Sequence, residues 1–158
     1  MRLALYEPDM APNVGAAIRA AACFGAGIDV IGPCGFPLDS KDLKRAAMDY
    51  AALAPPLLHS GWRAFLESPS RREGRLVLMT TRGAASLYDF AFAETDVILM
   101  GRESAGAPDE VHAEADVRLF IPMAQGARSL NIAVAAAVAL AEARRRTGWL
   151  DRRARGCE

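Results

Sequence analysis

The 158-residue sequence contains few of the side chains that usually carry metal or nucleophilic chemistry. It has two histidines, and its three cysteines lie far apart without a C-x-x-C pair. A metal site needs several such ligands at a defined spacing, and a disulfide framework needs paired cysteines. We therefore expect no metal cofactor. Free thiols are typical of a reducing compartment, so we expect a cytoplasmic location.

Excess charge and long apolar runs are lacking as well. Basic and acidic residues number 19 each, so the net charge does not indicate a nucleic-acid partner, and only local basic patches could. The most apolar segment is alanine-rich and lies between Asn131 and Glu142, which is too short for a membrane span. The first ten residues contain too short an apolar stretch for a signal peptide. We expect no membrane partner.

The common cofactor and hydrolase motifs are absent. The single G-x-G is formed by residues 25–27, where it precedes an expected strand instead of following one, and a third glycine is missing at the required offset. The sequence has no Walker loop and no G-x-S-x-G elbow. These absences argue against a dinucleotide-binding fold and an α/β-hydrolase.

Short apolar runs alternate with helical patterns over residues 1–150. This alternation predicts one α/β domain with a mostly parallel sheet, followed by a polar tail over 151–158 that we expect to be frayed. Asn13 and Ser60 are expected N-caps, and Gly25 is an expected helix stop. Strands are expected at 2–6, 28–32, 75–81, 96–101 and 117–122, and helices at 13–25, 39–50, 60–68, 108–115 and 126–146.

Three of the expected strands run into loops rich in small residues. The transitions read "LMTTRG", "LMGRESAG" and "FIPMAQGARS". In open parallel sheets, ligands bind beyond the carboxyl ends of the strands, and small residues let the backbone approach a ligand. A ligand site is therefore expected where these loops meet, although each loop alone could be an ordinary turn.

The first expected helix carries a second polar cluster. Gly15 and Arg19 are four residues apart and share a helix face, so Gly15 could leave room for a large group beside the guanidinium. Asn13 lies at the start of this helix, where backbone N–H groups favour anions. The alternative is a capping asparagine and a solvated arginine.

Four segments resemble, in order and spacing, the motifs of the SPOUT (α/β-knot) RNA methyltransferases. Within that superfamily they are similar to the small subgroup that methylates the ribose of the tRNA wobble nucleotide. The likeness covers about residues 1–150. The segments are "YEPDMAPNVGAAIRAAACFG", "GFPLDSKDLKRAAMDY", "ILMGRESAGAP" and "IPMAQGARSLNIAVAAAVAL".

The resemblance implies a single-domain parallel-sheet α/β knot, in which the C-terminal segment is tucked through a loop as a trefoil knot. It also implies S-adenosylmethionine as methyl donor and a homodimer with its active site at the interface. The acceptor would be the ribose 2′-hydroxyl of nucleotide 34, a cytidine or uridine, in the anticodon region of tRNA, with leucine tRNAs as the expected substrates. By position, the donor site would comprise Met79, Thr80, Gly101, Ile121, Met123, Ser129 and Leu130. The catalytic and RNA side would comprise Arg19, Ser129, Asn131, Asn13 and Glu103.

Four positions depart from the pattern of the family. Arg102 stands where the family often has a proline after the glycine of the second motif, and Ser104 stands where it often has a threonine. A serine supplies the same hydroxyl, whereas Arg102 adds charge to a loop that is usually rigid. In the "RAAMDY" segment, Ala47 stands where a glycine is commoner and Met48 where a leucine is commoner, which affects the subgroup assignment only slightly.

The proposed chemistry needs a group that handles the hydroxyl proton, and the motifs contain no histidine or cysteine for this. The family proposal assigns activation of the hydroxyl to Arg19. Because arginine is too basic to lose its proton, our hypothesis is that Arg19 orients an RNA phosphate and the hydroxyl, and that the phosphate helps to accept the proton. Ser129 could contact the donor, cap a helix, or do both.

RNA binding by this chain would depend on basic clusters. Each of three candidate clusters could instead be an ordinary solvated surface. The cluster nearest the C-terminus could also complement the negative end of a helix. Two other functions stay open: 2′-O-methylation of ribosomal RNA or of another tRNA position, and RNA binding without catalysis. The candidate clusters are Lys41, Lys44 and Arg45; Arg71, Arg72 and Arg75; and Arg144, Arg145 and Arg146.

Overall fold

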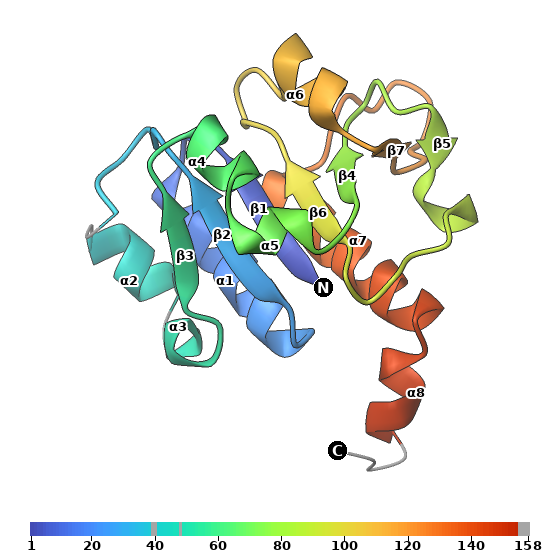
Figure 1. Ribbon diagram of the computed structural model, residues 1–158, viewed down its shortest axis with the longest axis horizontal. Helices are drawn as coiled ribbons and strands as arrows, with labels where there is room; N and C mark the ends of the chain where they lie inside the picture. Colours follow the sequence, from blue (N-terminus) through green and yellow to red (C-terminus); the bar gives the residue numbers. More distant parts are fainter. Residues whose placement is uncertain (39–40, 48, 155–158) are drawn as a thin grey trace.

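The described residues, 1–38, 41–47 and 49–154 of the computed structural model, form seven strands in one sheet (Figure 1). The strand order is β3-β2-β1-β6-β4-β7-β5, and every neighbouring pair is parallel. The strands are β1 (Arg2–Tyr6), β2 (Gly27–Ile31), β3 (Pro56–His59), β4 (Leu76–Met79), β5 (Ala85–Ser86), β6 (Val97–Met100) and β7 (Val117–Phe120). The α/β class with a parallel sheet is therefore confirmed.

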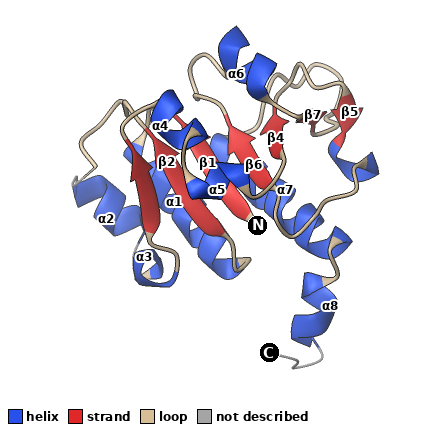
Figure 2. Cartoon of the chain, in the orientation of Figure 1, coloured by secondary structure: helices blue, strands red, loops and turns tan. Residues whose placement is uncertain are grey.

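Helices cover both faces of this sheet (Figure 2). Because the central strands are covered on both sides, β4 and β6 are continuous apolar runs and are buried along their whole length. One layer consists of α1 (Ala11–Cys23) and α7 (Ile132–Arg146), with α2 (Lys41–Ala47) and α3 (Tyr50–Leu53) packed on α1. The other layer consists of α4 (Trp62–Leu66), α5 (Pro69–Arg72) and α6 (Asp109–Glu114).

The five expected strands are confirmed to within two residues at each end, but β3 and β5 were missed. β3 begins at Pro56, directly after Pro55, and consecutive prolines are typical of a turn. A proline is tolerated there because β3 is an edge strand, on which a missing N–H can face away from the ladder. β5 has two residues and therefore no recognisable periodicity.

Several expected helix ends are wrong. α1 begins at Ala11 after Met10, with Pro12 in its first turn, so Asn13 lies inside the helix and is not its N-cap. α4 follows Gly61, and Ser60 makes no cap. Gly25 is confirmed as a helix stop, since its φ of +59° lies in the left-handed region that follows many helices.

The remaining helical predictions fall partly outside the described residues. The 39–50 pattern forms α2 and α3, while residues 39–40 and 48 lie outside the described part of the chain. The polar tail was expected to be frayed, but α8 (Trp149–Ala154) is helical. Residues 155–158 again lie outside the described residues.

Gly15 serves helix packing and does not make room for a ligand. A Cβ at this position would meet Ala46 and the backbone of Ala47 in α2, so the two helices approach closely because Gly15 has no side chain. The prediction of open space between Gly15 and Arg19 is therefore wrong.

The last helix begins later than its sequence pattern suggests. Asn131 is the N-cap of α7, and its Oδ1 accepts from the N–H groups of Ala133 at 2.9 Å and Val134 at 3.3 Å. Ser129 does not cap this helix, so that alternative is wrong. Residues 121–131 form a loop that carries the chain from β7 back to α7, which packs beside α1. This path of the chain is consistent with a trefoil knot, and the knot itself stays a prediction.

We predict that Asn131→Ala lowers the free energy of unfolding by about 1 kcal/mol, because two N–H groups of the first turn of α7 lose their acceptor. Asn131→Asp keeps an acceptor oxygen beside these groups, so its stability should stay close to that of the wild type. Ser129→Ala should change stability by less than about 0.5 kcal/mol. Urea unfolding followed by circular dichroism tests this, and a larger loss in Ser129→Ala than in Asn131→Ala would contradict it.

Candidate functional site

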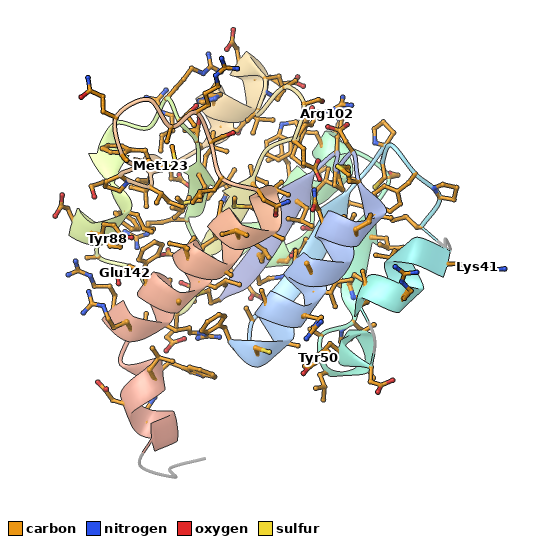
Figure 3. All side chains as sticks on the ribbon, turned by 180° about the vertical axis from the view of Figure 1, so that it is seen from behind. Lys41, Tyr50, Tyr88, Arg102, Met123 and Glu142 are labelled. Atoms are coloured by element: carbon orange, nitrogen blue, oxygen red, sulfur yellow. The ribbon has the colours of Figure 1, made fainter. Side chains whose placement is uncertain are left out.

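The loops that follow β1, β4, β6 and β7 meet around a cavity at the carboxyl edge of the sheet. Its volume is about 660 Å³, which lies in the range of sites for small molecules. The start of α7 closes one side of it, and Figure 3 labels Arg102 and Met123, two of its lining residues, at this end of the molecule. The expected meeting of the three Gly-containing loops is thus found, because β6, β4 and β7 are neighbours in the sheet.

The cavity brings together nearly all residues that the sequence analysis singled out. The seven residues expected at the donor all line it: Met79, Thr80, Gly101, Ile121, Met123, Ser129 and Leu130. Asn13, Glu103 and Asn131 line it as well. Arg19 does not line it, and its guanidinium instead lies over the ring of Tyr50, 5.2 Å from the ring centroid.

Three polar side chains of the cavity form a hydrogen-bonded relay. The Nδ2 of Asn131 donates to the Oδ1 of Asn13 at 2.9 Å, and the Nδ2 of Asn13 donates to the Oε1 of Glu103 at 3.0 Å. The direction of this relay is determined at both ends. Asn131 must point its oxygen at the N–H groups of α7, and a carboxylate of Glu103 can only accept. Both amide orientations therefore follow from their partners.

The position of Asn13 in the first turn of α1 explains how it joins the relay. Since the helix begins at Ala11, the side chain of Asn13 is not used by its own helix and faces the cavity. The relay thereby connects three distant segments of the chain, namely the β6–α6 loop, the start of α1 and the start of α7. Glu103 lies 90 residues after Asn13 in the sequence, and Asn131 lies 118 residues after Asn13.

A second network, which the sequence analysis did not identify, lies behind Glu103. The backbone N–H of Asp9 donates to the Oε2 of Glu103 at 2.8 Å. The carboxylate of Asp9 accepts from the hydroxyl and N–H of Ser104, at 2.7 and 3.0 Å, and from Arg102 at 2.8 Å. The hydrogen bonds from Ser104, and then that from Arg102, lower the pKa of Asp9 to about 2. The loop after β1 is thus bound to the loop after β6.

His112 also lines the cavity, although no motif in the sequence predicts it there. Its Nε2 is buried and has no hydrogen-bond partner among the described residues. Burial, followed by the nearby charge of Arg82, lowers the pKa of His112. The neutral ring is therefore favoured at neutral pH.

Two of the three expected basic clusters are compensated by acidic side chains. Arg71 pairs with Asp116, and Arg75 pairs with the buried Asp96. In the last cluster Arg144 is buried and pairs with Glu94. Arg145 and Arg146 both bind Glu142 and lower its pKa to about 2.

The first cluster lies on α2, away from the cavity, with Lys41 labelled in Figure 3. Lys41 and Arg45 are exposed, and the side chain of Lys44 lies outside the described residues. At the cavity itself, Arg128 is exposed and forms no ion pair with any described residue, while Arg82 is 63% exposed and lies 3.6 Å from Asp109. Of these two arginines only Arg128 lacks an acidic partner among the described residues, and it lies outside the three clusters.

No group of three or more histidine, cysteine, aspartate or glutamate side chains within the described ranges could hold a metal ion. Within the same part of the chain, no helix is long and apolar enough to cross a membrane.

Comparison with known proteins agrees with this geometry. The model of the SpoU rRNA Methylase family matches residues 1–141. A protein of Ancylobacter novellus named tRNA (cytidine(34)-2′-O)-methyltransferase is 52% identical over 99% of both chains. A protein of the same name from Beijerinckia indica subsp. indica is 45% identical over 94% of this chain and 92% of its own.

Solved structures show the same fold. One that concerns 2′-OH methylation of C/U34 on tRNA has a TM-score of 0.86 and 44% identity, and the match covers 92% of this chain and 94% of the other. The SpoU methyltransferase AviRb of Streptomyces viridochromogenes, in complex with AdoMet, has a TM-score of 0.85 and 27% identity over 92% of this chain and 59% of its own. Since the family model matches most of the chain and the relatives match nearly all of it, this protein belongs to the SpoU methylase family.

Proposed function

We propose that the protein transfers a methyl group from S-adenosylmethionine to the ribose 2′-hydroxyl of nucleotide 34 of tRNA. The observation that carries this proposal is the high identity, over nearly full length, with proteins named tRNA (cytidine(34)-2′-O)-methyltransferase. The cavity supports it, since the polar relay and the loops expected to hold the donor meet in one place. Cytidine or uridine at the wobble position of leucine tRNAs is the proposed substrate, and the cytoplasm is the proposed location.

The cavity has the size and the mixed lining that the donor requires. Apolar walls come from the side chains of Met79, Ile121 and Leu130, and small or polar groups come from Thr80 and Gly101. S-adenosylmethionine supplies a methyl group that its positively charged sulfur already activates, so the protein mainly has to align the two reactants. Met123 and Ser129 complete the set of residues proposed to hold the donor.

On the acceptor side, the relay offers oriented groups for the ribose. Glu103 holds the amide of Asn13, and Asn13 holds that of Asn131, so neither side chain has to reorganise when RNA arrives. We propose that Arg19 aligns an RNA phosphate with the 2′-hydroxyl while the phosphate accepts the proton, because arginine side chains do not serve as bases in proteins. His112 does not serve as the base in this proposal, because its Nε2 is buried.

The place of Arg19 supports a homodimer with the active site at its interface. Arg19 points at Tyr50 and does not line the cavity of its own chain. Exposed apolar side chains lie near the cavity on the side of α1 and α7, namely Met10, Leu130 and Val134. A second copy packed on this side would cover them and could supply its Arg19 to the site.

A target in ribosomal RNA is the second candidate. Two similarities favour it. The matching family is the SpoU rRNA Methylase family, and a solved rRNA methyltransferase of Sinorhizobium meliloti is 31% identical to this chain. This chain, however, covers only 55% of that rRNA methyltransferase, whereas it covers 99% of the tRNA-directed relative from Ancylobacter novellus. The match in length favours tRNA.

The main proposal predicts that tRNA from cells lacking this gene has no 2′-O-methyl group on nucleotide 34 of leucine tRNAs. The purified protein with S-adenosylmethionine should restore it, as measured by mass spectrometry of nuclease fragments. Ribosomal RNA from the same cells is the matched control and should be unchanged. If nucleotide 34 stays methylated in these cells, or if only rRNA accepts the methyl group, the proposal is wrong.

The dimer proposal predicts complementation between two inactive variants, Arg19→Ala and Asn131→Asp. A heterodimer isolated with two different tags has one site with both defects and one intact site, so it should recover about half of the wild-type activity. Each homodimer should stay inactive. If Arg19 serves its own chain, both sites of the heterodimer carry one defect and no activity returns.

RNA binding is predicted to depend on Arg128 more than on the compensated arginines. Arg128→Gln should weaken tRNA binding and reduce the slope of log K against log salt by about 1, because one phosphate contact is lost. Arg145→Gln is the matched control, and it should have little effect since Glu142 already compensates Arg145. Filter binding at several salt concentrations measures both. An equal loss in the two variants would contradict the assignment.

A further inference from the structure

Arg102 occupies a position that joins two loops of the cavity. One terminal nitrogen of its guanidinium donates to the Oε2 of Glu7 at 3.2 Å, and the other donates to the Oδ1 of Asp9 at 2.8 Å. Its backbone exchanges two hydrogen bonds with Gly106, both at 2.9 Å, which close the loop that contains Glu103. Arg102 therefore holds the loop after β6 in shape and fastens it to the loop after β1.

Asp9 contacts three successive residues of that loop. Its carboxylate binds Arg102 and Ser104, and its backbone N–H donates to the Oε2 of Glu103. The last bond matters for the relay, because it leaves the Oε1 of Glu103 to accept from Asn13. The orientation of the Glu103 carboxylate thus depends on where Asp9 lies.

The loop after β1 is held in an unusual conformation at this point. Glu7 has a φ of +42°, in the left-handed region that is unfavourable for a non-glycine residue. Its N–H donates to the carbonyl of Ile31 at 2.8 Å, and its carboxylate pairs with Arg102. Both contacts favour the turn that places Asp9 beside the loop after β6.

We propose that Arg102 and Asp9 act together as positioning residues that present Glu103 to Asn13, and through Asn13 to Asn131. The inference rests on the proposed methyl transfer and extends it to residues outside the relay. Two ion pairs, one with Glu7 and one with Asp9, restrict the position of Arg102 and of the loop that carries it.

The test compares Arg102→Gln, Arg102→Lys, Asp9→Asn and the double variant Arg102→Gln/Asp9→Asn. In Arg102→Gln, kcat for tRNA should fall by about 10- to 100-fold, since small misplacement of catalytic groups has effects of this size. The Kd for S-adenosylmethionine, from calorimetry, and the KM for tRNA should change by less than about threefold, which is the scatter of uninvolved sites. Arg102→Lys keeps one ion pair and should be intermediate. The double variant should lose no more than the worse single variant, because the two residues act in series.

NMR of the side-chain amides reports on the relay directly and does not depend on enzymatic activity. The side-chain amide signals of Asn13 and Asn131 in 15N-labelled protein should shift in Arg102→Gln and in Asp9→Asn. They should stay in place in Arg63→Gln, the matched control, whose only ion pair among the described residues is an exposed one with Glu67. Thermal melting of each variant identifies any that fail to fold, and Arg102→Lys then carries the test.

The outcomes separate this inference from the proposed function. Unshifted amide signals together with wild-type kcat would overturn the positioning role. A weakened donor Kd at unchanged kcat would make Arg102 a donor contact, and a raised KM for tRNA alone would make it an RNA contact, so either result also overturns it. If the wild-type protein fails to methylate tRNA while the amide signals shift as expected, the proposed function fails and the positioning contact stands.

Discussion

The side chain of Asn131 is the point on which fold and site both depend. Its oxygen satisfies two N–H groups that would otherwise lack partners at the start of α7, and its nitrogen joins the relay to Asn13 and Glu103. An ionised aspartate could cap the helix but could not donate to Asn13, whereas an amide has an acceptor oxygen and a donor nitrogen on separate atoms. The same amide therefore links the stability of the last helix to the arrangement of the cavity.

The sheet topology determines why the cavity lies where it does. Three neighbouring parallel strands, β6, β4 and β7, end at one edge, and each continues into a loop with small residues. This much could be predicted from the sequence, since apolar runs followed by glycine-containing loops are visible without a structure. The short edge strands could not, because β3 starts with a proline and β5 has only two residues.

The parts of the site that the sequence did not predict depend on contacts between distant segments. Asn13 looked like a cap because it precedes an apolar pattern, yet the helix starts at Ala11, and the side chain is free to face Glu103. Gly15 looked like part of a ligand site, yet it allows α2 to pack closely. Arg102 looked like a departure from a family pattern, and only the structure shows its two carboxylate partners.

The balance of charge in this chain is consistent with RNA binding once its distribution is considered. The net charge is zero, but acidic side chains are placed where they compensate arginines on the surface away from the cavity, as Glu142 does for Arg145 and Arg146. Arg128 at the cavity has no such partner among the described residues. Because screening limits electrostatic attraction to about 8–10 Å at physiological salt, a phosphate near the cavity responds to the charges around it, including Arg128, and not to the charge of the whole chain. A neutral protein can therefore attract RNA locally, at the place where its proposed reaction requires the ribose.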